Sequence, residues 1–205
     1  MASTEKIYFY PGWLRLWHGL NALGIIILIV TGLSMNASLE SPLIGFSLAV
    51  SLHNIAGVLV SFLYVVYIIG NMMTPNGTFY LFKLKGFLRR IVKQAYYYAW
   101  GMFHGMDYPF PLSAKRKFNP LQQFAYVSVM YFVVPVLIIT GFALLFPETI
   151  IENVYGLSGV FVTAILHSAV GFFVSIFLII HLYVASIGKS PVENFKSIIS
   201  GWHHI

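Results

Sequence analysis

Residues 166–182, LHSAVGFFVSIFLIIHL, decide the fold of this chain, because so apolar a run predicts a membrane-spanning helix. The helix carries two histidines, His167 and His181. At about 3.6 residues and about 5.4 Å per turn, His181 returns to within about 40° of His167, about 21 Å farther along the axis. One helix therefore offers two imidazoles on one side, at two depths. Imidazoles are costly in lipid and mark a functional site, and neutral imidazole is a common axial ligand of haem iron.

The composition places the chain in a membrane. Of its 205 residues 59% are hydrophobic and only 9% are charged, whereas a soluble domain carries about 25% charged residues. Cysteine is absent, which excludes cysteine-ligated iron–sulfur clusters, c-type haem, thiolate zinc sites and disulfides. The formal charge of +6 is interpreted as a sign of membrane orientation and not of nucleic-acid binding, because in a membrane chain the position of the charges matters most.

Four apolar segments are each long enough to cross a hydrocarbon core of about 30 Å. They predict an all-α integral membrane protein, a four-transmembrane-helix bundle in a single domain over residues 1–205. The expected spans cover residues 14–35, 43–73, 121–146 and 157–187. Pro135 lies within the third span and is expected to kink it.

A basic and aromatic segment, residues 74–119, connects the second and third spans and is expected on the cytoplasmic side. Within it, Phe79–Met102 mixes basic residues with large apolar ones, a pattern typical of a helix lying in the lipid headgroup region. Such a helix either anchors the loop by its charges and rings or docks a partner. After the fourth span, Ser190, Pro191 and Glu193 have the form of a helix start, with a short helix to about Ser200.

The charges predict the orientation. With four spans and a cytoplasmic amino terminus, all 12 Lys and Arg fall on the inner side, and the outer turns carry Glu40, in Ala37–Pro42, and Glu148 and Glu152, in residues 147–156. This separation satisfies the positive-inside rule and puts both termini in the cytoplasm. The first residues, MASTEKIYFYPGW, have no pattern of a removable signal peptide.

This orientation sorts four histidines into two pairs of matching depth. His53 and His167 lie at the outer level, and His18 and His181 at the inner level. A small residue follows each histidine by one helical turn, on the same face, where a porphyrin edge would need a gap. These small residues are Ala22, Gly57, Gly171 and Ala185.

Other roles for these histidines are weaker. A single intramembrane histidine often just hydrogen-bonds a Ser, a Tyr or a carbonyl group, but that role predicts neither equal depth nor pairing. A transport site would require carboxylates within the membrane, and the four predicted spans contain no Asp or Glu. The remaining histidines, His104, His203 and His204, are expected at the surface.

Several local motifs carry a resemblance to a known family. They are Arg15-Leu-Trp-His18 and Thr31-Gly32 in the first span, Lys117-Phe-Asn-Pro-Leu-Gln122 before the third, Thr140-Gly141 at its end, and the His167–His181 spacing. Over about residues 13–201 the chain resembles the di-haem b-type cytochrome membrane subunits of bacterial respiratory complexes. This is the family of membrane anchors of formate dehydrogenase, thiosulfate reductase and nickel–iron hydrogenase; the Asn-Pro-Leu-Gln form is more similar to the first two branches.

The resemblance implies two haem b groups. The outer haem would be held by spans two and four, and the inner haem by spans one and four, in agreement with the depth pairs. It also implies a quinone, menaquinone or ubiquinone, beside the inner haem, contacted by Asn119 with His181 nearby and, less directly, by Gln122 or Lys117. Asn119 also suits a helix N-cap. Arg15 and Arg116 suit haem propionates or lipid phosphates.

We therefore expect a cytochrome b subunit in a bacterial or archaeal cytoplasmic membrane. It would pass electrons between the quinone pool and an outer-side subunit carrying iron–sulfur, c-haem or other metal centres, in either direction. Its only chemistry of its own would be quinone or quinol redox, and it would contact lipid but no nucleic acid. The alternatives are a haem-free transporter or proton relay, which would need histidines at staggered depths with carboxylates, and a structural assembly anchor.

Overall fold

The computed structural model describes residues 6–35, 43–188 and 190–204, with the backbone alone for residue 204. The expected turn at Ala37–Pro42, with Glu40, lies outside this range. In chain order the elements are β1 (Lys6–Tyr8), α1 (Gly12–Met35), α2 (Phe46–Met73), η1 (Pro75–Tyr80), α3 (Phe87–Ala99), η2 (Gly101–His104), α4 (Pro120–Ser128), η3 (Val129–Val133), α5 (Val134–Leu145), η4 (Pro147–Thr149), β2 (Asn153–Val154), β3 (Leu157–Ser158), α6 (Gly159–Ala185), α7 (Glu193–Ser200) and β4 (Trp202–His204).

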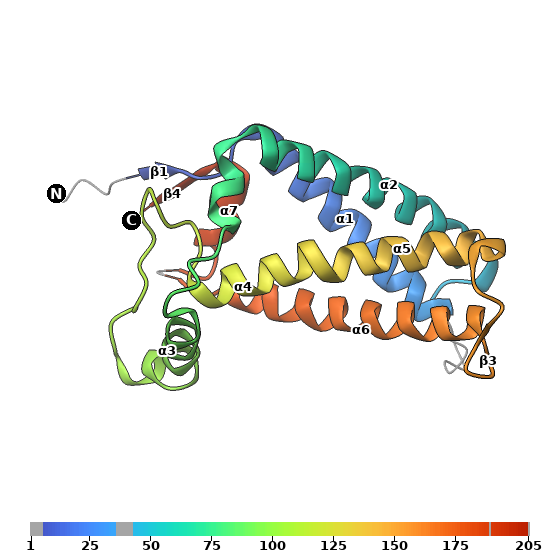
Figure 1. Ribbon diagram of the computed structural model, residues 1–205. Coiled ribbons are helices and arrows are strands. Elements are labelled where there is room, and N and C mark those ends of the chain that lie inside the picture. Colours follow the sequence, from blue (N-terminus) through green and yellow to red (C-terminus); the bar gives the residue numbers. More distant parts are fainter. Residues whose placement is uncertain (1–5, 36–42, 189, 205) are drawn as a thin grey trace.

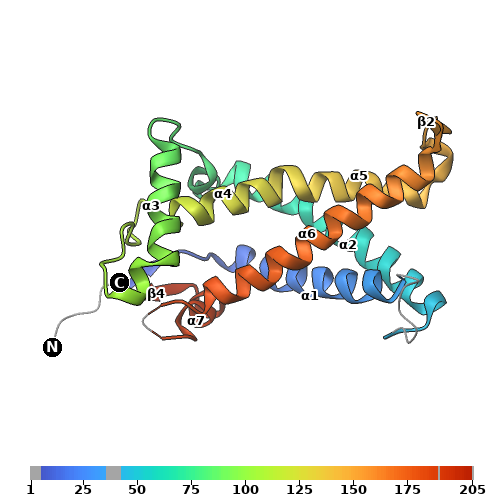
Figure 2. The ribbon, with the colours of Figure 1, turned by 90° about the horizontal axis from the view of Figure 1, so that it is seen from below.

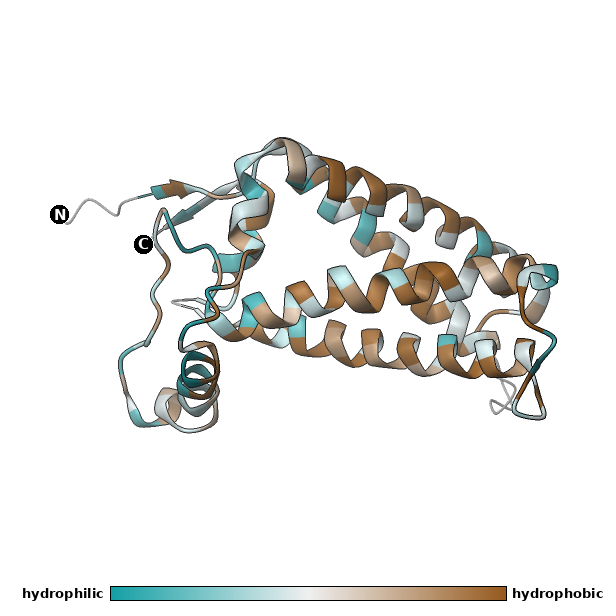
Figure 3. Ribbon diagram, viewed as in Figure 1, coloured by the Kyte–Doolittle hydropathy of each residue, from teal (hydrophilic) through white to brown (hydrophobic). Residues whose placement is uncertain are grey.

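The four predicted spans are confirmed. They are α1, α2, the continuous run α4–η3–α5 and α6, which have 24, 28, 26 and 27 residues and mean hydropathies between 1.9 and 2.3. Their ends differ from the predicted ones by at most three residues. Only 6% to 22% of the residues in their most apolar windows are buried inside the chain, so most of each helix surface is apolar and faces outward (Figure 3). Such surfaces are suited to lipid.

The spans form two helix pairs. Helix α1 packs against α2 and α5 packs against α6, and the pairs meet through α1 with α6 and α2 with α5 (Figures 1 and 2). We call the end that carries β1, β4, α3 and α7 the basic end, because the described lysines and arginines gather there. We call the opposite end, with the β2–β3 hairpin, the hairpin end.

The third span contains the irregularity expected at Pro135. The residues just before the proline, Val129–Val133, form the π-helical segment η3, and α5 starts at Val134. A proline has no N–H and its ring collides with the carbonyl group four residues earlier, so the regular α-helical ladder cannot pass through it. A π segment accommodates this break without ending the span.

Aromatic side chains hold the basic end together. Leu14, Trp17 and Tyr67 form a buried cluster between α1 and α2. The rings of Trp17 and Tyr67 stack with centroids 4.5 Å apart, and the Trp17 indole donates to the Leu63 carbonyl group at 2.8 Å. In addition, β1 pairs antiparallel with β4, so the two ends of the chain are hydrogen-bonded to each other. These strands were not predicted from the sequence.

Two helix starts at the basic end differ from the prediction. The expected helix at Phe79–Met102 begins only at Phe87, after Gly86 in a left-handed conformation (φ 69°). Helix α3 runs across the spans (Figure 2) and exposes Leu88, Val92 and Tyr96 along one face, as expected for a surface helix. The predicted Ser190 cap is wrong, because α7 starts at Glu193. The Ser190 carbonyl group instead accepts the Glu193 N–H, which closes a turn before the helix.

The close approach of α1 and α2 depends on Gly70. A Cβ atom at this position would lie 2.7 Å from the Trp13 ring, whereas one at Gly12 would meet no heavy atom within 4 Å. We predict that Gly70→Ala destabilises the protein by about 1–3 kcal/mol, because a bulky ring must shift. The measurement is the melting temperature in detergent, with Gly12→Ala as the control. Equal melting temperatures of the two variants would contradict the packing argument.

Candidate functional site

Four histidines from three spans meet in two pairs, as the depth argument predicts. His53 of α2 and His167 of α6 have ring centroids 6.2 Å apart, with their planes at 70°. His18 of α1 and His181 of α6 have centroids 6.3 Å apart, with their planes at 53°. All four rings are partly buried. Helix α6 therefore contributes one imidazole to a pair near the hairpin end and one to a pair near the basic end.

Threonine hydroxyl groups hold both rings of the hairpin-end pair. Thr31 donates its only proton to the Ile27 carbonyl group at 2.6 Å, so its oxygen accepts from His53 Nδ1 at 2.9 Å. Thr140 donates to the Val136 carbonyl group at 2.7 Å and accepts from His167 Nδ1 at 2.8 Å in the same way. These contacts assign the proton to Nδ1 and leave the lone pair on Nε2, the atom that can bind a metal.

A glycine follows each threonine and lies against the histidine ring, and at Gly141 a side chain would crowd that ring. A Cβ atom at Gly32 would lie 3.6 Å from His53 Cε1, and one at Gly141 would lie 3.2 Å from His167 Cε1. In the sequence the Thr-Gly dipeptides supported only the family resemblance, and their contacts with the histidine rings were not predicted. The sequence did contain a signal for these contacts: a Thr-Gly dipeptide occurs on two different spans, each time near the predicted depth of His53 and His167.

The basic-end pair is held more loosely. His181 Nδ1 lies 3.4 Å from the Tyr126 hydroxyl group, a long contact, and its ring stacks on Phe177 with planes at 15°. Within the described part of the chain, no hydrogen bond reaches a ring nitrogen of His18. The two pairs thus share a spacing but differ in support.

The helix surface beside two of the histidines is open, as the small residues one turn after them predicted. A Cβ atom at Gly171, one turn after His167, would meet no heavy atom within 4 Å. A Cβ atom at Gly57, one turn after His53, would meet only Leu28, at 3.9 Å. Both helices are therefore open next to a candidate ligand.

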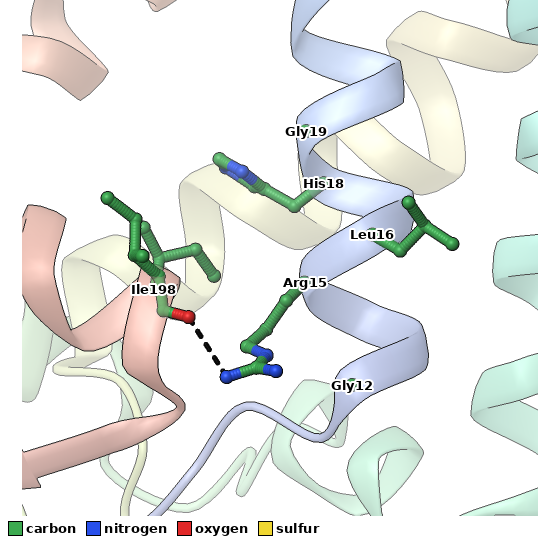
Figure 4. A pocket seen from close by; sticks show the side chains of 7 residues that line it. Gly12, Arg15, Leu16, His18, Gly19 and Ile198 are labelled. Carbon is green, nitrogen blue, oxygen red and sulfur yellow. Dashed lines mark hydrogen bonds between the residues drawn. The ribbon is translucent and has the colours of Figure 1, made fainter.

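An open pocket of about 330 Å³ lies against His18 at the basic end (Figure 4). It is bounded by the start of α1 and by α7, and Arg15 reaches across it to donate to the Ile199 carbonyl group at 2.9 Å. The Nε atom of Arg15 is buried without a hydrogen-bond partner. The pocket therefore combines an imidazole with a cation that has bonding capacity left for an anionic group.

Asn119 is fully buried and caps α4, as its residue type suggested. Its side-chain oxygen accepts the Gln122 N–H at 2.9 Å, and the Gln122 side chain accepts the Asn119 N–H at 3.2 Å. Both amide hydrogens are also used, since the Asn119 nitrogen donates to the hydroxyl groups of Tyr98 and Tyr108 at 2.8 Å each.

Lys117, two residues earlier, is buried among aromatic rings. Its ammonium group donates to the Asn76 side chain at 2.7 Å and lies 4.5 Å from the centre of the Tyr10 ring. Burial lowers the pKa of Lys117 to about 7. The ring faces of Tyr10, Phe79 and Phe118 oppose this effect, because they favour the charged form.

Arg116 and the three histidines predicted at the surface have other surroundings. Arg116 is exposed, with its guanidinium 5.7 Å from the Phe110 ring. His104 is exposed, as expected, and stacks on Trp100. The prediction that His203 is a surface residue is wrong: its ring is buried, with Nδ1 3.0 Å from the Ser197 hydroxyl group, because the β1–β4 pairing folds the end of the chain over α7. The side chain of His204 lies outside the described residues.

Known proteins are similar in sequence to this chain over nearly its whole length. The family described as prokaryotic cytochrome b561 matches residues 9–201. A protein of Escherichia coli (strain K12) named "Putative cytochrome YdhU" is 36% identical over 199 residues, which cover 97% of this chain and 75% of the relative. The family implies haem b and a role in electron transfer, and the four apolar spans agree with a multi-pass membrane protein. The chain belongs to the prokaryotic cytochrome b561 family of membrane cytochromes b.

Proposed function

We propose that this protein is the membrane subunit of a quinone-linked redox complex and binds two haem b groups, each between two histidines. His53 and His167 would hold one group near the hairpin end, and His18 and His181 the other near the basic end. When bound, the haems supply one-electron transfer between an outer-side redox partner and the quinone pool. With two imidazoles on each iron, no coordination position stays open for oxygen.

The spacing of the histidine rings carries the proposal. Two metal–nitrogen bonds of about 2 Å, plus roughly 1 Å from each nitrogen to its ring centre, separate two imidazoles on one metal by about 6 Å. The observed separations are 6.2 and 6.3 Å. Two rings packed against each other can also have such a separation. Packing alone, however, does not explain why Thr31 and Thr140 bind Nδ1 of His53 and His167 and so leave Nε2 free for a metal.

The distribution of charge supports the orientation. The described lysines and arginines lie at the basic end, whereas Glu148 and Glu152 lie at the hairpin end. By the positive-inside rule, the basic end and both termini are cytoplasmic, in a bacterial or archaeal cytoplasmic membrane. The hairpin end then faces the outer partner. That partner must carry the iron–sulfur, c-haem or other metal centres, because a chain without cysteine has no ligands for such clusters or attachment points for c-type haem.

The quinone, menaquinone or ubiquinone, would bind at the basic end near His181 and Asn119. Since both amide hydrogens of Asn119 are bound to tyrosines, a quinone carbonyl group would take the place of Tyr98 or Tyr108. Either exchange replaces one neutral hydrogen bond by another, so it costs little. Arg15, in the pocket beside His18, is suited to a haem propionate or a lipid phosphate.

One prediction of this proposal concerns the haem content. His53→Ala and His167→Ala should each remove one b haem and largely retain the other, because each variant deletes a ligand of the same group. His18→Ala and His181→Ala should remove the second haem. The measurement is a reduced-minus-oxidised visible spectrum with a haem count per purified chain. His104→Ala is the control and should keep both haems; a wild-type protein without haem would contradict the proposal.

A further prediction separates the two roles of Asn119, the cap of α4 and the proposed quinone contact. Asn119→Asp keeps the oxygen that caps α4 but removes both amide donors, so the Michaelis constant for a short-chain quinol should rise about 10-fold, within the cost of a buried hydrogen bond. The readout is the rate at which the quinol reduces haem b. His104→Ala, at the exposed surface, is the control and should leave this constant near the wild-type value. An unchanged constant in Asn119→Asp would show that Asn119 only caps the helix.

A further inference from the structure

The two histidine pairs have the same spacing but different hydrogen-bond partners. At the hairpin end, both Nδ1 atoms meet a threonine oxygen, at 2.9 Å for His53 and 2.8 Å for His167. At the basic end, the described contacts are a single tyrosine hydroxyl group 3.4 Å from His181. Because each threonine proton is already given to its own helix, these hydroxyl groups can only accept from the imidazoles.

Such contacts change the chemistry of a ligand as well as its position. An imidazole that donates from Nδ1 places more electron density on Nε2, which makes it a more basic ligand with a fixed ring orientation. A more basic ligand stabilises the oxidised, more positive iron over the reduced one. The threonines therefore favour a lower reduction potential at the hairpin end.

The charges act in the same direction. Arg15 lines the pocket beside His18, and the buried Lys117 also lies at the basic end. Nearby cations stabilise the state that carries the extra electron, and carboxylates destabilise it. At the basic end the described lysines and arginines outnumber the described carboxylates, Asp107 and Glu193, and thus favour a higher potential there, whereas Glu148 and Glu152 favour a lower one at the hairpin end.

We propose that Thr31 and Thr140 are positioning residues which fix the ligands His53 and His167 and hold the redox centre at the hairpin end at the lower reduction potential of the two. This inference rests on the proposed function. Electrons move spontaneously from the lower to the higher potential, so between the two centres the arrangement favours an electron at the basic end.

The test is a potentiometric titration of the purified protein, with its haems, after removal of each hydroxyl group. Thr31→Val and Thr140→Val keep the side-chain shape but cannot accept a hydrogen bond. Each should raise the midpoint potential of one haem component by about 30–60 mV. At about 59 mV per factor of ten for a one-electron couple, this shift corresponds to about a three- to tenfold weaker preference for the oxidised form. The shifted component should be the one that His53→Ala removes, and Thr31→Ser and Thr140→Ser should restore its potential.

Thr163→Val is the matched control. Thr163 lies in α6 and also donates to the carbonyl group four residues earlier, at 2.8 Å, but among the described residues its hydroxyl group is not hydrogen-bonded to a histidine. This variant should leave both potentials unchanged. Loss of haem in the valine variants but not in the serine variants would also support the positioning role.

Three results would overturn the inference: unchanged potentials in both valine variants, a shift in the haem that depends on His18, or a wild-type protein whose lower-potential haem survives in His53→Ala. Equal loss of haem in the valine and serine variants would likewise overturn it, by showing a packing role alone. A failure of the proposed function is separate, because it would appear as a wild-type protein that lacks two b haems.

Discussion

The structure depends on one constraint: a polar ring inside hydrocarbon must find partners for its nitrogen atoms within the protein. For His53 and His167 the first nitrogen is bound by a threonine hydroxyl group that its own helix already orients. The second nitrogen is left for another partner. A metal placed between the two rings would satisfy both free nitrogens at once, and this is why the histidines are best understood as pairs.

The same local solution occurs in both helix pairs. In α1 and α2, Thr31-Gly32 supports His53, and in α5 and α6, Thr140-Gly141 supports His167. Each threonine binds one ring nitrogen, and at Gly141 the missing Cβ atom leaves room for the His167 ring. Because α6 also carries His181 of the basic-end pair, a single helix sets the separation between the two histidine pairs, and the third span absorbs its irregularity at η3 without disturbing that helix.

The two ends of the bundle are chemically different. The basic end combines cations, tyrosines and the fully buried Asn119, which suits exchange of protons and of a polar quinone head. The hairpin end offers carboxylates and a rigidly held histidine pair. An electron that crosses inward moves against the membrane potential, at about 2.3 kcal/mol per 100 mV. A potential that rises from the hairpin end to the basic end would offset part of this cost.

The sequence by itself determined the four spans and predicted their orientation and the pairing of the histidines, because hydropathy and helical period are local properties and depth follows from the order of the spans. Only the tertiary structure decided that Thr31 and Thr140 bind His53 and His167, since these contacts join different helices. The burial of His203 and the late start of α7 at Glu193 were likewise beyond the sequence, because both depend on how the end of the chain folds back on the bundle and pairs with β1.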